Sequence, residues 1–203
     1  TGTIDLVSMN LIPGNTVGNY WIVPGTYITN NFKVTYEPSF YSIIPAPATV
    51  VFDNESLTQT YDGTAKSAVA VAGSGEIELA FTYNGSPDLP VDAGTYEVIA
   101  TITDPNYSGA DTALITIEHA QLIIDADTLG KIYGNNDPEL TFTVLAGQLF
   151  GMDEFSGTLE RQGGESVGNY PIFQGNLSAG DNYAITFTQG SFTIEPALIT
   201  VKA

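Results

Sequence analysis

The residue types that usually perform hydrolysis or hold metal ions are scarce in this chain. It has no cysteine and one histidine, His119. This excludes disulfides, thiolate metal sites and a cysteine nucleophile, and hydrolase triads and zinc cages usually need histidine or cysteine. Repeat alignment places His119 opposite Pro45 and Pro196, at a hinge between repeats. We therefore expect a linker role for His119, with a pH-sensing or ligand role as the alternative.

Carboxylates are the remaining candidates for catalysis, because the chain has 23 Asp and Glu residues. A pair of carboxylates can hydrolyse glycosidic bonds, but no acidic pair here lies in a distinctive motif. Asp137 and Asp153-Glu154 have the pattern of a solvated acidic surface. We expect no catalytic residues and no enzyme activity, with an acid-pair glycosidase as the alternative that measurable hydrolysis would reveal.

One acidic stretch partly fits the start of a D-x-N-x-S-G calcium loop, through Asp104, Asn106, Ser108, Gly109 and Asp111. Ile115 stands where such a loop places its bidentate glutamate. We expect instead a turn in which Asn106, like Asn31 and Asn182, bonds to local backbone. Calcium held by Asp104, Asn106 and Asp111 is the alternative, and no other cofactor is expected.

The charge of the chain limits its partners. The formal net charge is −18, from 5 basic and 23 acidic residues. Nucleic-acid phosphates and anionic lipid surfaces repel such a chain, so we expect no nucleic-acid partner. No apolar run reaches the roughly 18 residues of a spanning helix, so we expect no membrane insertion of this segment. No signal peptide is visible at Thr1.

A tyrosine motif recurs along the chain. VGNY occurs at 17–20 and again at 167–170, and GTY occupies 94–96 between them. Tyr20, Tyr96 and Tyr170 each follow a glycine by two residues, namely Gly18, Gly94 and Gly168. In immunoglobulin-like sandwiches such a tyrosine bonds its hydroxyl to nearby backbone and fixes a corner, and the glycine permits a tight turn or a positive φ. We expect this structural role, with a ligand contact as the alternative.

The repeats divide the chain into units. DNYAITF and SFTIEPA of the last repeat align with NNFKVTY and SFYSIIPA of the first, and ALITIEHA of the middle repeat aligns with the latter. We expect the later part of one repeat at 1–46 and complete repeats at 47–119 and 120–197. Residues 198–203 are expected to be the first strand of a following repeat, because ALITVKA resembles AQLIIDA at 120–126.

Each unit has the pattern of β-strands. Leu140, Phe142 and Val144 alternate with polar residues, as do Tyr183, Ile185 and Phe187, and Gly, Asn, Asp and Pro interrupt the strands at short intervals. This pattern predicts an all-β fold of antiparallel, immunoglobulin-like β-sandwiches. The junctions are short and two of the three contain proline, which makes them stiff. We therefore expect the units to lie end to end as an elongated rod.

The third unit strongly resembles the MBG domains, the mostly bacterial immunoglobulin-like repeats. The resemblance rests on KIYGNNDPELTFTV, GTLERQGGESVGNYPIF, NYAITF and FTIEPA. The middle unit, with TYDGTAK and DPNYSG, is similar to a sister type. The first unit replaces the RxxGE segment, which spans Arg161 and Glu165 in the third, with LVSMNLIPGN. The resemblance implies tandem, non-catalytic modules in large secreted or surface-anchored bacterial proteins, often adhesin-like.

These observations predict a stalk that projects a functional domain from a bacterial surface, with adjacent repeats of the same chain as its partners. The alternative is an adhesive module that contacts a glycan or protein, for which Trp21 is the aromatic candidate. Trp21 could instead pack between units. Arg161 and Glu165 could pair across a turn, which stabilises little if the pair is exposed. A strand edge left open invites a partner, so strand addition of residues 198–203 to another copy is a further expected contact.

Overall fold

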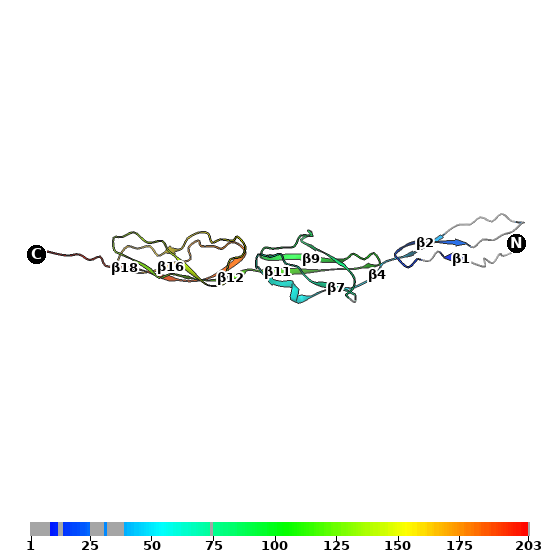
Figure 1. Cartoon of the computed structure of the whole chain (residues 1–203), viewed down its shortest axis with the longest axis horizontal. Coiled ribbons are helices and arrows are strands. Elements are labelled where there is room, and N and C mark those ends of the chain that lie inside the picture. Colours follow the sequence, from blue (N-terminus) through cyan, green and yellow to red (C-terminus); the bar gives the residue numbers. More distant parts are fainter. Residues whose placement is uncertain (1–8, 12–13, 25–30, 32–38, 74, 203) are drawn as a thin grey trace.

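A computed structural model describes residues 9–11, 14–24, 31, 39–73 and 75–202 of the 203-residue chain. The first unit contributes one antiparallel sheet in the order β1-β2-β3, made of β1 (Met9–Leu11), β2 (Gly18–Pro24) and β3 (Ser39–Ile43). Residues 30 and 32–36, which the repeat alignment predicts as a strand, lie outside the described residues. Figure 1 shows the three units one after another along the long axis of the molecule.

The second unit consists of a four-stranded sheet and two short pairs of strands. The large sheet has the order β6-β11-β9-β8, made of β6 (Thr58–Thr60), β8 (Leu79–Tyr83), β9 (Gly94–Ile102) and β11 (Ala110–Glu118). The pairs are β5 (Val50–Phe52) with β7 (Ala70–Ala72), and β4 (Ala46–Pro47) with β10 (Tyr107–Ser108). One 3-10 turn, η1 (Asn54–Leu57), begins at Asp53, whose carboxylate accepts the Glu55 amide. Ala46, the last residue of the predicted first unit, pairs with Tyr107 of this unit.

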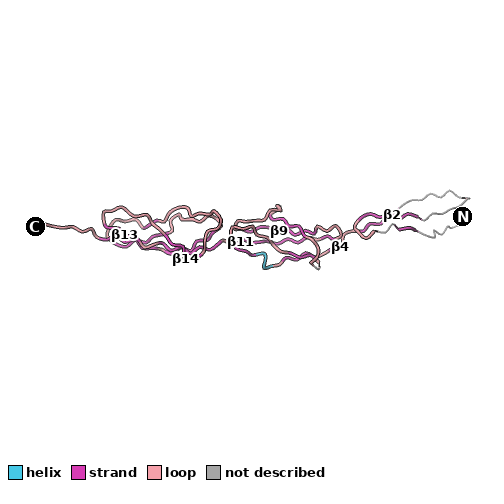
Figure 2. The backbone as a smooth tube through the Cα atoms, viewed as in Figure 1, coloured by secondary structure: helices cyan, strands magenta, loops and turns pink. Residues whose placement is uncertain are grey.

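The third unit is built from two sheets. The first has the order β13-β18-β16-β15, made of β13 (Leu129–Ile132), β15 (Glu160–Arg161), β16 (Gly168–Phe173) and β18 (Gly190–Glu195). The second has the order β14-β12-β17, made of β12 (Ala120–Ala126), β14 (Phe142–Ala146) and β17 (Tyr183–Thr188). Figure 2 shows strands and loops along this whole unit. No helix in the described part of the chain is long and apolar enough to cross a membrane.

The prediction of wholly antiparallel sheets is wrong for several strands of the two complete units. β6 pairs in parallel with β11, β12 with β17, and β13 with β18. Alternating residues reveal a strand and its two faces but not the direction of its neighbour. The chain enters each complete unit at one end and leaves it at the other (Figure 1). In each of them an early strand runs in the same direction as the last strand and pairs with it in parallel, β6 with β11 and β13 with β18.

Two apolar clusters fill the complete units. Val98, Ala100 and Ile115, all fully buried, lie at the centre of the second unit. The larger cluster fills the third unit and includes Phe192, but it also takes in Tyr61 and Ile117 from the second unit. The apolar core therefore continues across the junction between these two units.

Candidate functional site

The three recurring tyrosines hold the loops at the start of equivalent strands. The hydroxyl of Tyr20 donates to the carbonyl of Thr16 at 2.6 Å, that of Tyr96 to Asp92 at 2.9 Å, and that of Tyr170 to Ser166 at 2.7 Å. In each case the acceptor lies four residues earlier. The loop that enters β2, β9 or β16 is thereby tied to the strand itself.

The glycines two residues before these tyrosines share an unusual backbone conformation. Gly18, Gly94 and Gly168 have φ values of 154°, 156° and 158°. Residues with a Cβ rarely adopt these angles. The glycine lets the loop turn into the strand, and it places the amide of the preceding residue at the end of the unit.

That amide binds an asparagine of the next unit. The Val17 amide donates to the side-chain oxygen of Asn106 at 3.2 Å, and the Ala93 amide donates to that of Asn182 at 2.8 Å. Both bonds span 89 residues, so the same contact joins the first unit to the second and the second to the third. The side-chain amide of Asn182 also donates to Asp92 at 3.0 Å.

The prediction that Asn106 and Asn182 bond to local backbone through their side chains is therefore wrong. The local turn is made by Asp104, whose carboxylate accepts the Asn106 amide at 2.8 Å and the Asn106 side chain at 3.1 Å. This turn frees the Asn106 side-chain oxygen to reach the preceding unit. The turn predicted around Asn31 lies beside residues outside the described part of the chain.

We call the contact between the second and third units the second junction. We expect Asn182→Ala to weaken it by about 1–2 kcal/mol, because the substitution removes two inter-unit hydrogen bonds, one of them to a carboxylate. Hydrogen exchange at the Ala93 amide, which donates to Asn182, measures the loss directly. Asn135→Ala is the matched control, since Asn135 lies in an exposed turn at the far end of the third unit. Equal exchange at Ala93 in both variants would show that the asparagine does not hold the junction.

Aromatic residues pack across the same junction. The Tyr61 ring, in the second unit, meets Tyr183 at 5.5 Å and Phe150 at 5.9 Å between centroids, in edge-on geometry. The carboxylate of Asp153 accepts the hydroxyls of Tyr61 at 2.8 Å and Tyr183 at 2.7 Å. The Phe150 amide donates to the Tyr183 hydroxyl at 2.7 Å. Tyr61, Phe150, Asp153 and Tyr183 thus form a cluster at the junction between the second and third units.

The tyrosine hydroxyls of this cluster hold their protons strongly. Burial raises the pKa of Tyr183 to about 12, and the hydrogen bond and charge of Asp153 act in the same direction. The hydrogen bond to Asp153, followed by burial, raises the pKa of Tyr61. Sequence reasoning took Asp153 for a solvated surface acid, because its tyrosine partners lie in two different units and far away along the chain.

The structure does not gather the candidate calcium ligands. Asp104 is engaged in its own turn, and the Asp111 carboxylate accepts the amide of Thr112 at 2.9 Å. Among the residues that the structure describes, no three His, Cys, Asp or Glu side chains lie close enough together to hold a metal ion. His119 is exposed between β11 and β12, where the chain passes from the second unit to the third.

Trp21 lies on an exposed face of the first unit. It is 54% exposed and meets Phe40 of the neighbouring strand edge-on at 6.1 Å. Phe40 is 56% exposed, so the two rings form an apolar patch on the first unit rather than a contact between units.

The predicted Arg161–Glu165 pair belongs to a larger ionic cluster, made of Lys131, Asp137, Arg161 and Glu165. Arg161 contacts Asp137 at 2.6 Å and Glu165 at 2.7 Å, and Lys131 contacts both carboxylates. The Arg161 side chain is 9% exposed, and its guanidinium lies over the rings of Tyr170 and Phe192 at 5.4 and 4.9 Å. Hydrogen bonds from Arg161 and then Lys131 lower the pKa of Asp137 to about 2.

We expect Arg161→Gln to destabilise the third unit by about 2 kcal/mol at pH 7, through lost charge-assisted hydrogen bonds and cation–π contacts. The pKa of Asp137 lies below its usual value in the fold, so the contribution is complete above about pH 4 and is lost as pH falls to about 2. The difference in thermal unfolding between the two forms should therefore narrow in acid to what the cation–π contacts contribute. Lys202→Gln, the same charge change at an exposed position, is the control. A difference of constant size between pH 5 and pH 2 would mean that the ion pairs of Arg161 contribute nothing to stability.

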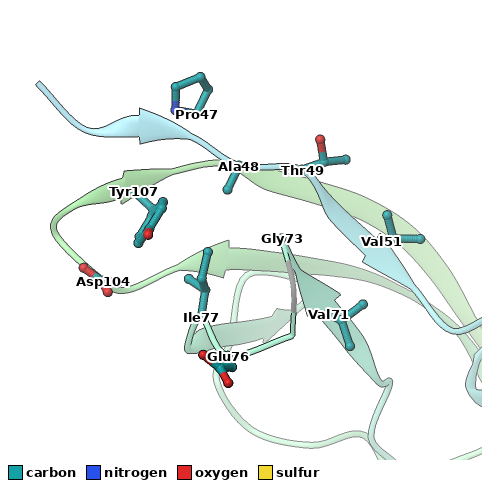
Figure 3. Close-up of a pocket in the computed structure, with 10 residues that line it drawn as sticks. All are labelled: Pro47, Ala48, Thr49, Val51, Val71, Gly73, Glu76, Ile77, Asp104 and Tyr107. Atoms are coloured by element: carbon teal, nitrogen blue, oxygen red, sulfur yellow. The ribbon is translucent and has the colours of Figure 1, made fainter.

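A cavity of about 690 Å³ lies at the end of the second unit that faces the first. Figure 3 shows Tyr107 and Ile77 turned towards one another, with Asp104 and Glu76 nearby. Tyr107 is the counterpart of the buried Tyr183, but it is 40% exposed. The lining combines an aromatic ring, apolar side chains and two carboxylates, which suits a neutral or cationic ligand better than an anion.

These observations define a class: an all-β protein of successive β-sandwich units whose recurring polar residues lie at the junctions. Residues 48–121 match the MBG domain, and residues 122–193 match the MBG domain of YGX type. The chain therefore belongs to the MBG-domain family. MBG domains are non-catalytic repeat modules associated with extracellular or surface proteins. The comparison with curated proteins gave no match.

Proposed function

We propose that this segment is a non-catalytic stalk of a large bacterial surface or secreted protein, in which the units form an end-to-end rod that holds a functional domain away from the surface. The observation that carries the proposal is the repeated junction contact, from Val17 to Asn106 and from Ala93 to Asn182. Domains joined by flexible linkers do not require a specific hydrogen bond at the same position of successive junctions. A stiff array does, because each contact removes freedom of bending.

The parallel strand pairs supply the second argument. In each complete unit an early strand pairs in parallel with the last strand, β6 with β11 and β13 with β18. Tension applied to the two ends of a unit pulls these strands in opposite directions along their length. The hydrogen bonds of the pair are then loaded together rather than one by one. Resistance to forced unfolding, which depends on the unfolding rate, suits a stalk under load.

Small-angle scattering tests the proposal. The chain is compared with a variant that carries six added Gly and Ser residues between His119 and Ala120, which separates the second and third units with a flexible linker. We expect a narrow distribution of long distances for the natural chain and a broader distribution with shorter distances for the variant. Indistinguishable curves would mean that the natural junction is already flexible, and the stalk proposal would fail.

An adhesive role is the second candidate, and two features favour it. The cavity that contains Tyr107, and the exposed patch of Trp21 and Phe40, are surfaces that could stack on a sugar ring of a host or surface glycan, or contact a protein. Binding on a glycan array that is lost in Tyr107→Ala or Trp21→Ala and kept in Tyr133→Ala would establish it. Unchanged binding in the first two variants would show that neither surface is the site.

A further inference from the structure

The turn that follows Tyr61 in the second unit is held by an ion pair. Lys66 is 8% exposed, and its ammonium contacts the carboxylate of Asp62 at 2.6 Å. A buried ammonium is unfavourable unless it is paired, so the contact fixes the Lys66 side chain. The other carboxylate oxygen of Asp62 accepts the Thr64 amide at 2.9 Å. The hydrogen bond from Lys66, followed by those from Thr64, lowers the pKa of Asp62 to about 2, so this carboxylate is charged at neutral pH.

This turn lies against the third unit. Gly63 has a φ of 76°, in the left-handed region that favours glycine. A Cβ added at Gly63 would lie 3.1 Å from the Cβ of Phe150 and 3.9 Å from the amide nitrogen of Gly151. The ring of Tyr61, two residues earlier, packs edge-on against Phe150. The turn and the ring therefore form one surface, which contacts the loop of the third unit that contains Phe150.

The backbone of Lys66 connects this surface to the other part of the second unit that contacts the third. The Lys66 amide donates to the carbonyl of Pro90 at 2.8 Å. Soon after Pro90 come Asp92 and Ala93, which both bind Asn182 of the third unit. Lys66 thus joins the two contact segments, because its side chain holds the turn and its amide holds the loop.

The third unit contains a tyrosine in the same backbone setting but without this ion pair. The Tyr133 amide donates to the Glu195 carbonyl at 2.8 Å, as the Tyr61 amide does to Glu118. The residues that follow Tyr133, GNNDP at 134–138, contain no lysine. The bond between such a tyrosine and the last strand of its unit therefore forms without a buried lysine, so that bond does not explain Lys66.

We propose that Lys66 is a positioning residue of the second junction. With Asp62 it holds the turn at 61–64 and the loop at 90–93 together as one docking surface, whose partner is the loop around Phe150 of the YGX-type unit. A surface fixed in advance loses less conformational freedom when it docks, so more of the contact energy opposes bending. The inference deepens the proposed stalk and rests on it, because it requires a junction with a specific contact.

Lys66→Met tests the role, because it keeps much of the apolar side chain and removes the ammonium. We expect hydrogen exchange at the Ala93 amide to become about fivefold to tenfold faster. The Thr103 amide, which donates to Glu78 at the opposite end of the second unit, should exchange as before. Lys202→Met, the same loss of charge at an exposed position, should change neither amide. Faster exchange at both Ala93 and Thr103 would assign Lys66 to the fold of its own unit and overturn the positioning role.

A glycine pair tests the position of the turn without removing a charge. Gly63 and Gly85 lie in the second unit with φ values of 76° and 81°, so alanine has a similar backbone cost at both. A Cβ at Gly85 would meet no heavy atom within 4 Å, whereas at Gly63 it meets Phe150. Gly63→Ala should therefore speed exchange at Ala93, and Gly85→Ala should not. Equal exchange at Ala93 in these two variants would show that the turn does not dock.

A double variant tests the ion pair itself. Asp62→Asn combined with Lys66→Met should exchange at Ala93 no faster than Lys66→Met alone, because both substitutions break the same contact. Additive effects would show that the two residues act separately and would overturn the proposal. Unchanged exchange at Ala93 in Lys66→Met would also overturn it. If the flexible insertion after His119 still broadened the distance distribution, the stalk proposal would stand without it.

Discussion

Tyr61→Ala should uncouple the second and third units at a cost of about 3–5 kcal/mol, the range for removing a buried aromatic ring. The side chain is 6% exposed, packs edge-on against Tyr183 and Phe150, and donates its hydroxyl to Asp153. Its removal leaves a cavity between two units and deprives a half-buried carboxylate of one donor. Differential scanning calorimetry should show a lower transition for the third unit, and scattering should show a wider range of inter-unit angles.

The chain offers a close control for this experiment. Tyr133 has the same backbone setting as Tyr61 but is 54% exposed, so Tyr133→Ala should change stability by less than about 0.5 kcal/mol. Tyr61→Phe removes the hydroxyl and keeps the ring, so it should lower stability by about 1 kcal/mol, the contribution of the hydrogen bond to Asp153. Equal losses for Tyr61→Ala and Tyr133→Ala would show that Tyr61 acts within its own unit rather than across the junction.

The sequence predicts much of this fold because the units repeat. Aligning VGNY at 17–20 with its counterpart at 167–170 identifies Tyr20, Tyr96 and Tyr170 as equivalent, and period-2 alternation marks strands such as β9 and β17. These signals are local, since each depends on residues within one strand or turn. The family resemblance adds Lys131, Asp137 and Arg161 as matching residues, although without their contacts.

The junction contacts could not be predicted in the same way, because they join residues that local patterns do not relate. Asn182 and Asp104 both have the sequence pattern of an Asx turn, yet only Asp104 makes that turn. An asparagine that bonds to its own backbone and one that reaches a neighbouring unit look alike in sequence. The hydrogen bonds at the two junctions span the same 89 residues, and this equal spacing could have identified the asparagines. It is recognised only once it is known which loops of successive units are in contact.

The sequence does not predict whether neighbouring strands are parallel or antiparallel, for a related reason. The alternating residues of β12 place Leu122 and Ile124 in the core whichever way its neighbour runs. The direction depends on how the strands of the whole unit are connected, which alternation within one strand does not show.

Alkaline pH should weaken the second junction over a defined interval. The pKa of Tyr183 rises from 10.0 to about 12 in the fold, chiefly through burial and also through Asp153. Between these values the folded chain retains a proton that the unfolded chain has lost. Stability is therefore constant below about pH 10, falls between pH 10 and 12, and levels off above. The total loss is about 3 kcal/mol if Tyr183 acts alone, and Tyr61, whose pKa is also raised, adds to it.

Urea unfolding of the third unit at pH 9, 10, 11 and 12 measures this interval. The quantity to compare is the slope of the free energy of unfolding against pH, not its absolute value. Tyr183→Phe removes the titrating hydroxyl, so its stability should fall less over the same range even though it starts lower at pH 9. Tyr133→Phe, an exposed tyrosine in the same unit, should keep the full slope and thereby control for general repulsion in a chain of net charge −18. If Tyr183→Phe and Tyr133→Phe give the same slope, the loss in alkali comes from overall charge. In that case the Tyr61–Asp153–Tyr183 contact is not what couples the junction to pH.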